Sequence, residues 1–229
     1  MNTATNAQEA SLTSSKTAEG NPQAHAPGSP IIAVIGDGQL ARMMQTAAIE
    51  LGLSLRLLAE APGSSAAQVC SDVWFGDYKN LDTLKAVVDG ATAVTFDHEH
   101  VPTEHLEALV AAGHLIQPGP HALVNAQDKL IMRRRLQDLG APVPEFTSIE
   151  SVQDATEFFD RVNGAVCLKA RRGGYDGHGV WFPDDRAELE TLVMKLLDER
   201  TPLMAERKVA LTHELSALVA RRPSGEVKA

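Results

Sequence analysis

A loop rich in glycine and basic residues is the segment of this sequence best suited to handling phosphate. It runs Lys-Ala-Arg-Arg-Gly-Gly-Tyr-Asp-Gly-His-Gly from Lys169, with four glycines between Gly173 and Gly179. Glycines would let the loop fold over a triphosphate, and the cations would offset charge that develops in phosphoryl transfer. Because no Gly-Lys-Ser/Thr follows, the pattern indicates a lid rather than a Walker A loop. The alternative is a long hairpin turn with solvated Arg171 and Arg172.

A second glycine turn, Gly36-Asp-Gly-Gln-Leu-Ala41, fits the pattern G-x-G-x-x-A between an apolar run and a helical pattern. Its backbone N–H groups could hold a substrate phosphate at a helix N-terminus. The residues assigned to this contact are Gly36, Gly38, Gln39 and Leu40. Glu60 stands where a dinucleotide-binding domain places its ribose-binding acid, so an NAD(P)-binding oxidoreductase is a competing hypothesis. A turn needed only for packing is a third interpretation.

Histidines near residue 100 raise the question of a metal site. His98 and His100 would point to the same side of a strand, as two zinc ligands do in His-x-His. His105 falls on the next predicted helix and no further ligand is indicated. We therefore favour no metal site within this chain.

Two features around residue 130 have structural interpretations. The run Arg133 to Arg135 fits a solvated helix face better than an anion site. Asp128 is expected to cap the N-terminus of that helix.

Strands and helices alternate in the part of the chain that would position the first glycine turn. Ile31 to Ile35 is a continuous apolar run, typical of a buried parallel strand. Helical spacing follows over residues 39–51, 81–88 and 103–112, and further strands are expected at residues 54–59, 91–96 and 115–116. This alternation predicts an α/β fold with a doubly wound parallel sheet.

A second unit is expected to begin near Gln127. Its predicted helices cover residues 127–139, 152–162 and 186–197, and its predicted strands cover residues 165–169, 180–182 and 203–206. This order indicates an α+β lid whose glycine loop joins two antiparallel strands. The stretch Glu214 to Ala220 follows the last predicted strand.

Composition excludes several classes of protein. The 229 residues are 44% hydrophobic and carry a formal charge of −9, which argues against nonspecific binding to nucleic acid or acidic membranes. Cys70 and Cys167 form no CxxC pair and are expected to be reduced and buried. No apolar run reaches the roughly 20 residues that span a bilayer, so a cytoplasmic location is expected. Residues 1–30 have almost no large apolar side chains and are predicted to be a disordered tail.

Five segments in a fixed order carry a resemblance to one enzyme family. They are Gly36-Asp-Gly-Gln-Leu-Ala-Arg-Met43, Ala66-Ala-Gln-Val69, Thr95-Phe-Asp-His-Glu-His-Val101, Gln127-Asp-Lys129 and Arg172-Gly-Gly-Tyr-Asp-Gly-His-Gly-Val180. Together they resemble the ATP-dependent carboxyaminoimidazole ribonucleotide synthases of purine biosynthesis, which are ATP-grasp ligases. The resemblance extends from Ile31 to about Val227 and demotes the oxidoreductase hypothesis; a noncatalytic phosphate-binding module is the other alternative.

The resemblance implies a domain order. A Rossmann-like pre-ATP-grasp domain would cover residues 31–126, after the tail of residues 1–30. An ATP-grasp lid with its linker helix would cover residues 127–208, and an incomplete ATP-grasp central domain residues 209–229.

The same resemblance implies contacts with ATP. Lys129 and Lys169 would contact the phosphates or the adenine side, and Glu214 would accept from the ribose hydroxyls. The loop that closes over ATP would be Gly174, Tyr175, Asp176, Gly177, His178, Gly179 and Val180. The strand that reads adenine through its backbone would be Glu206, Arg207, Lys208 and Val209.

Catalytic roles are implied for Glu99, Tyr175 and His178. Glu99 could orient the substrate amine or accept its proton, and Tyr175 could position bicarbonate. His178 stands where the family commonly has Arg or Lys, so its charge would depend on protonation.

The implied reaction joins bicarbonate to 5-aminoimidazole ribonucleotide at the expense of magnesium ATP, through carboxyphosphate that a closed lid protects from water. The sequence stops before the acidic residues with which the family binds Mg²⁺. We therefore expect the metal ligands outside this chain, little activity of the chain alone, and a homodimer when the protein is full length.

Overall fold

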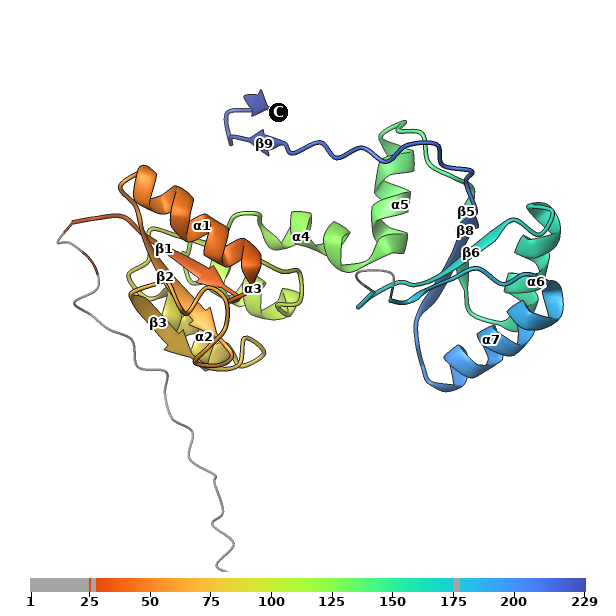
Figure 1. The fold of residues 1–229 in the computed structure, drawn as a ribbon, viewed down its shortest axis with the longest axis horizontal. Helices are drawn as coiled ribbons and strands as arrows, with labels where there is room; N and C mark the ends of the chain where they lie inside the picture. The colour runs from red at the N-terminus through yellow and green to blue at the C-terminus, as the bar shows by residue number, and fades with distance from the viewer. Residues whose placement is uncertain (1–24, 26–27, 175–177) are drawn as a thin grey trace, which may run out of the picture. The chain divides into compact units, whose positions relative to one another are not determined.

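The computed structural model describes His25, residues 28–174 and residues 178–229. The chain divides into two compact units, Met1–Ala126 and Gln127–Ala229, which run from red to green and from green to blue in Figure 1. Each unit is built around its own sheet and hydrophobic core.

The first unit contains a sheet of parallel strands, as its alternating sequence predicts. The strands are β1 (Ile31–Ile35), β2 (Ser54–Ala59), β3 (Asp72–Phe75) and β4 (Ala93–Phe96), in the order β3-β2-β1-β4. Figure 1 labels the first three of them. Strand β3 was not predicted, because its short sequence Asp-Val-Trp-Phe shows little periodicity. The strand expected at residues 115–116 is a single parallel bridge between Ile116 and Val94.

Helices cover both faces of this sheet. Helix α1 (Gln39–Glu50) contributes Ala41 and Ala48 to a cluster with Val34 and Leu57. Helices α2 (Leu81–Val88) and α3 (Thr103–Ala111) pack against the opposite face. The strand residues that they contact, such as Ile35 and Leu58, are sequence neighbours of Val34 and Leu57, whose side chains point the other way. The sheet is therefore doubly wound, with its loops at the carboxyl ends of the strands free to form a site.

The helix expected over residues 127–139 is observed, and a second short helix that was not predicted precedes it. Helix α4 (Pro120–Gln127) and helix α5 (Lys129–Asp138) are separated at Asp128. The Asp128 carboxylate accepts hydrogen bonds from the backbone N–H groups of Leu130 (3.0 Å) and Ile131 (3.3 Å). The predicted N-cap is thus confirmed, and the cap explains why α5 begins at Lys129.

The second unit contains a four-stranded antiparallel sheet in the order β5-β8-β6-β7. Its strands are β5 (Phe146–Ile149), β6 (Val166–Ala170), β7 (Val180–Trp181) and β8 (Leu203–Arg207). As predicted, the glycine loop joins the antiparallel strands β6 and β7. Strand β5 was not predicted, because Phe146 to Ile149 alternates too briefly to give a clear signal.

One face of this sheet is covered by helices α6 (Val152–Arg161) and α7 (Arg186–Asp198). Their apolar residues form a core with Val166, Leu168, Leu203 and Ala205. Side chains at intervening strand positions point to the opposite face. That face therefore remains available for a ligand.

The chain ends in an extended segment. Residues 208–219 have no regular secondary structure, and β9 (Ala220–Arg221) pairs with β10 (Val227–Lys228) in a short hairpin. Leu215 is 96% exposed and Leu218 is 90% exposed. This segment thus carries apolar side chains without a core around them.

The segment expected to be a tail contacts the first unit before residue 31. His25 Nε2 lies 2.5 Å from Asp72 Oδ2, and the Pro30 carbonyl accepts a hydrogen bond from Ser54 N–H. The other tail residues, 1–24 and 26–27, lie outside the described residues. Cys70 and Cys167 are free thiols, as expected; Cys167 is buried, but Cys70 is only partly buried, which corrects the expectation for that residue. Among the described residues, no helix has the length and apolarity needed to cross a membrane.

Candidate nucleotide site

A pocket of about 410 Å³ lies in the second unit. Residues of β6, of β8 and of the chain that follows β8 line it, together with a residue of α5. Five of the predicted ATP-contact residues line it, namely Lys169, Glu206, Arg207, Lys208 and Val209. These residues come from β6, from β8 and from the turn that follows β8. The structure therefore brings together residues of two strands that are well separated in the sequence.

Strand register explains this convergence. In the β6–β8 pair, Cys167 lies opposite Glu206 and Lys169 lies opposite Met204. Their neighbours Val166 and Leu168 are in the core beneath α6 and α7. Because side chains alternate across a sheet, Cys167, Lys169 and Glu206 all project from the other face.

The Glu206 carboxylate is the electrostatic centre of the pocket. Its side chain is 7% exposed and forms ion pairs with Arg133, Nε to Oε2 at 2.8 Å, and with Lys169. Burial alone would raise the pKa of Glu206, but hydrogen bonds from Arg133 and Lys169 outweigh it and hold that pKa below its ordinary value. Glu206 is therefore an anion that two cations neutralise.

The position of Arg133 corrects one prediction. The run Arg133 to Arg135 was interpreted as a solvated helix face, which holds for the exposed Arg134 and Arg135. Arg133 instead lines the pocket with 20% of its side chain exposed. Its partner Glu206 lies 73 residues away, so helical spacing alone could not reveal the contact.

A second cluster fixes the beginning of the glycine loop to α5. Asp128 Oδ2 accepts from Arg171 Nη2 at 2.8 Å and lies 3.3 Å from Arg172 Nε, while Lys129 N–H donates to the Arg171 carbonyl. Burial would raise the pKa of Asp128, but hydrogen bonds from Arg171 and from the backbone lower it. Both arginines are therefore ion-paired rather than simply solvated.

Lys129 reaches the loop itself. Its Nζ donates to the Gly174 carbonyl at 3.3 Å, and a side chain at Gly174 would lie 2.7 Å from the His178 carbonyl. Gly179 has φ +71°, and its carbonyl accepts from Ala170 N–H. The described ends of the loop, Gly174 and His178 to Val180, are thus close together. Tyr175, Asp176 and Gly177 lie outside the described residues.

Glu214 does not line this pocket and is exposed on the C-terminal segment. Its predicted contact with the ribose therefore stays a prediction. Beside Arg133, four residues line the pocket without having been predicted: Pro144, Cys167, Phe182 and Leu211. Cys167 was within reach of sequence reasoning, because it lies two positions before Lys169 on the same strand.

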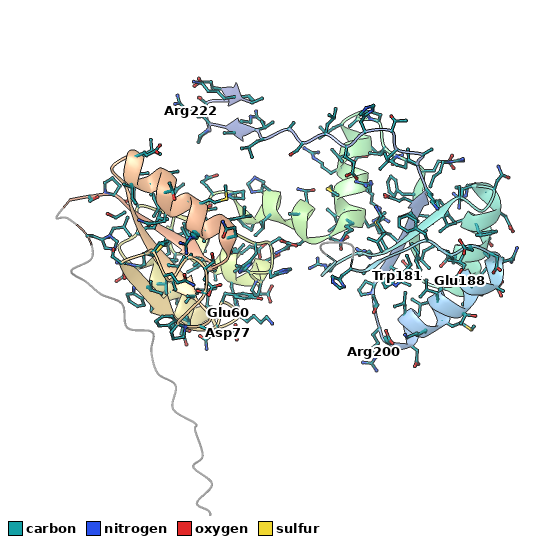
Figure 2. The ribbon with its side chains drawn as sticks, in the orientation of Figure 1. Glu60, Asp77, Trp181, Glu188, Arg200 and Arg222 are labelled. Carbon is teal, nitrogen blue, oxygen red and sulfur yellow. The ribbon has the colours of Figure 1, made fainter. Side chains whose placement is uncertain are left out.

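A larger pocket in the second unit has a different character. Its volume is about 810 Å³, and it is formed by β7 and α7 with Trp181, Glu188 and Lys195 among its lining residues. Figure 2 labels Trp181 on the strand and Glu188 on the helix. Of the predicted site residues it includes Val180 alone. The larger pocket therefore contains few of the residues that were predicted to bind ATP.

The first glycine turn is organised by an aspartate from another strand. Asp97, directly after β4, accepts a hydrogen bond from Gly38 N–H at 2.7 Å. A side chain at Gly36 would place its Cβ 1.7 Å from Asp97 Oδ1, and Gly36 has φ +123°. Glycine is thus required at position 36. The N–H of Gly38 already has a carboxylate partner, whereas Gln39 and Leu40 belong to the first helical turn, whose N–H groups have no intrahelical acceptor.

Glu60 and Asp77 follow β2 and β3 at the same edge of this sheet (Figure 2). Glu60 is exposed, and its backbone N–H donates to Asp37 Oδ2 at 3.0 Å. This places Glu60 beside the first glycine turn, as its position in the sequence suggested.

The histidines after β4 stack on one another. The rings of His98 and His100 lie 5.3 Å apart, and the ring of Tyr78 lies 4.7 Å from His98. Burial lowers the pKa of His98, which favours its neutral form. His105 Nε2 lies 2.8 Å from the Lys79 carbonyl. Within the described ranges no three His, Cys, Asp or Glu side chains are placed to hold a metal. Glu99, between the two stacked histidines, is half-buried.

Comparison with known families assigns both units. Residues 30–127 match the family model of the ribonucleotide synthetase preATP-grasp domain, and residues 134–229 match that of the ATP-grasp domain. The chain is 68% identical over 209 residues to the N5-carboxyaminoimidazole ribonucleotide synthase of Corynebacterium ammoniagenes, covering 91% of this chain and 51% of that protein.

Solved structures agree with this assignment. An N5-carboxyaminoimidazole ribonucleotide synthetase in complex with ADP superposes with a TM-score of 0.79 at 27% identity, over 87% of this chain and 53% of the other. The synthetase of Thermus thermophilus superposes with a TM-score of 0.74 at 31% identity, over 86% and 52%. The chain thus spans about half the length of the relatives that it matches.

Proposed function

This chain belongs to the N5-carboxyaminoimidazole ribonucleotide synthase family of ATP-grasp ligases, and we propose that it supplies the ATP-binding site of such a ligase. The reaction is the carboxylation of 5-aminoimidazole ribonucleotide by bicarbonate, with ADP and phosphate as by-products. The family resemblance favours this activity over an NAD(P)-dependent oxidoreductase or a noncatalytic phosphate-binding module.

One observation supports the proposal above all. Five of the residues that the family resemblance assigned to ATP, Lys169 and Glu206 to Val209, line one pocket of about 410 Å³. The pocket is lined by cations, among them Arg133, Lys169 and Lys208, and by the residues that follow β8. A relative of this fold at 27% identity is a complex with ADP.

The contact with adenine falls to a short stretch of backbone. The N–H groups of Arg207 and Lys208 donate to the carbonyls of Glu145 and Ala165, each at 2.8 Å, and so are not available to a ligand. We assign the donor to N1 of adenine to Val209 N–H, and the acceptor for its amino group to a carbonyl of the same stretch. Lys169 would then lie on the phosphate side, and Lys129 with Gly174 would hold the loop that closes over the nucleotide.

The proposed chemistry has two steps. An oxygen of bicarbonate attacks the γ-phosphorus of ATP, ADP leaves, and carboxyphosphate forms. The exocyclic amine of the imidazole then attacks the carbonyl carbon, phosphate leaves, and the amine loses a proton. We propose Glu99 as the acceptor of that proton, with Tyr175 and His178 positioning bicarbonate. Gly36, Gly38, Gln39 and Leu40 remain our proposal for the substrate phosphate, with Gln39 and Leu40 as the donors.

Magnesium is a separate matter. Family members are expected to use Mg²⁺ with ATP, but the described residues contain no group of three His, Cys, Asp or Glu that fits a metal. We therefore derive no step through the metal from this chain. We also propose, from the family resemblance, that the full-length protein assembles as a homodimer. Size-exclusion chromatography with light scattering would test this oligomeric state.

The function can be tested in two stages. Isothermal titration calorimetry should show binding of ADP to this chain, lost in Lys169→Met and retained in Lys195→Met, whose lysine lines the other pocket. In a chain extended to the length of its relatives, ADP formation should depend on both aminoimidazole ribonucleotide and bicarbonate. Turnover that ignores either substrate would contradict the proposed reaction.

A further inference from the structure

The buried carboxylate of Glu206 is shared between two cations of different mobility. Arg133 presents two nitrogens to it, Nε to Oε2 at 2.8 Å and Nη2 to Oε1 at 3.4 Å. Lys169 contacts Oε1 with its single ammonium group. The guanidinium is a rigid fork that matches a carboxylate, whereas the ammonium is a point charge on a flexible stem. Of the two partners, Lys169 is the one that can be redirected without breaking a two-point contact.

Nucleotide binding sets up a competition for Lys169. A phosphate oxygen would attract the ammonium group away from Glu206, whose side chain is only 7% exposed. A buried carboxylate that loses its counter-ion pays a large desolvation penalty. If Lys169 were the only partner of Glu206, this penalty would make the binding free energy of the nucleotide less favourable.

Arg133 is placed to prevent that loss. It comes from α5, an element separate from the strands that carry Lys169 and Glu206. The first turn of α5 is fixed by Asp128, which caps the helix and binds Arg171 at the start of the glycine loop. Arg133 can therefore remain on Glu206 while Lys169 moves.

We propose that Arg133 is a positioning residue for ATP: it keeps Glu206 neutralised, so that Lys169 is available to a nucleotide phosphate. The inference rests on the proposed function, since it assumes that nucleotide occupies this pocket. Arg133 itself need not touch the nucleotide. Its effect passes through the carboxylate that it shares with Lys169.

The test is a rescue experiment on ADP binding to this chain. Arg133→Met keeps the apolar stem of the side chain but leaves Lys169 as the only cation on Glu206, so ADP affinity should fall by about tenfold or more. Arg133→Met/Glu206→Gln removes the charge that captures Lys169, so affinity should return to within about threefold of the original chain. Arg134→Met, one position along the same helix and exposed, is the matched control and should bind ADP normally.

The outcomes separate this inference from other roles of Arg133. If the double variant binds as weakly as Arg133→Met, Arg133 acts through packing or through the nucleotide directly, and the inference is wrong. Unchanged affinity in Arg133→Met would also overturn it. If the original chain binds no ADP, the proposed function fails instead.

A measurement without nucleotide tests the same point. Acetic anhydride labels free lysine amines, and mass spectrometry can follow the rate at Lys169. Labelling should be slower in Arg133→Met than in the original chain, because Lys169 is then the sole cation on Glu206 and is held more firmly. It should be faster in Glu206→Gln, because the carboxylate that holds the ammonium group is gone. Equal rates in the three proteins would show that Glu206 does not govern the availability of Lys169. Far-ultraviolet circular dichroism would confirm that each variant is folded.

Discussion

Asp97 holds the first glycine turn from a different strand: its Oδ2 accepts the backbone N–H of Gly38 at 2.7 Å, across 59 residues of sequence. Its other oxygen occupies the space that a side chain at Gly36 would need. The turn is thus defined jointly by two glycines and one carboxylate. The same contact fills part of the space at the N-terminus of α1, where a phosphate was predicted.

Gly36→Ala should destabilise the chain by about 1–3 kcal/mol, because the new Cβ meets Asp97 and the backbone keeps a positive φ. Urea unfolding followed by circular dichroism would measure the loss. Gly63→Ala is the matched control, since a Cβ there meets nothing within 4 Å. Adding Asp97→Ala to Gly36→Ala should recover only the steric part. A loss no larger than that of Gly63→Ala would show that the turn relaxes freely.

Asp128→Ala should lower the free energy of unfolding by about 2–3 kcal/mol. The substitution removes the N-cap of α5, and it also removes the buried carboxylate with which Arg171 and Arg172 are paired. Asp128→Asn should cost less, because asparagine still caps the helix while losing the charge. Asp185→Ala is the control: Asp185 caps α7 through Glu188 N–H, and its removal should cost about 1 kcal/mol. Free energies of unfolding in urea would compare the three. Equal losses in Asp128→Ala and Asp185→Ala would mean that the arginine pairs contribute nothing.

Acid should weaken the second unit through Glu206. Its pKa is held below the ordinary value of 4.5 in the folded chain, so the unfolded chain binds more protons as the pH falls. The stability contributed by Glu206 is therefore present above about pH 4.5 and is lost as the pH falls through its folded pKa. Unfolding free energies at about pH 7 and about pH 4 should differ less in Glu206→Gln than in the original chain. An identical difference would place the acid sensitivity elsewhere, with Asp128 the next residue to test.

Cys167 should report occupancy of the pocket. Burial raises the pKa of its thiol, so little thiolate forms at neutral pH and alkylation by iodoacetamide should be slow. In a Cys70→Ala background, mass spectrometry should show labelling of Cys167 that rises with pH and is slowed further by ADP. Cys70 provides the comparison in a Cys167→Ala background, where ADP should have no effect because Cys70 does not line the pocket. Protection of Cys70 rather than Cys167 would move the nucleotide to another part of the chain.

Several features of this protein followed from the sequence alone. The apolar run at Ile31 to Ile35, the helical spacing after it and the glycine loop were sufficient to predict a parallel sheet in the first unit and an antiparallel pair around the loop. These are local signals, because strand and helix periodicity depends on neighbouring residues. Each motif that carries the family resemblance is also a short run of consecutive residues, and the matches to the two family models confirm the resemblance.

Only the tertiary structure decided which residues face one another in the site. Arg133 was predicted to be solvated, yet it neutralises Glu206 from 73 residues away. Asp97 was noted only as part of a motif, yet it fixes the backbone at Gly38. Such contacts depend on where strand register and helix packing place charged groups that are distant in sequence. Short strands such as β3 and β5 were missed for a related reason: they are stabilised by pairing with β2 and β8 rather than by a periodic pattern of their own.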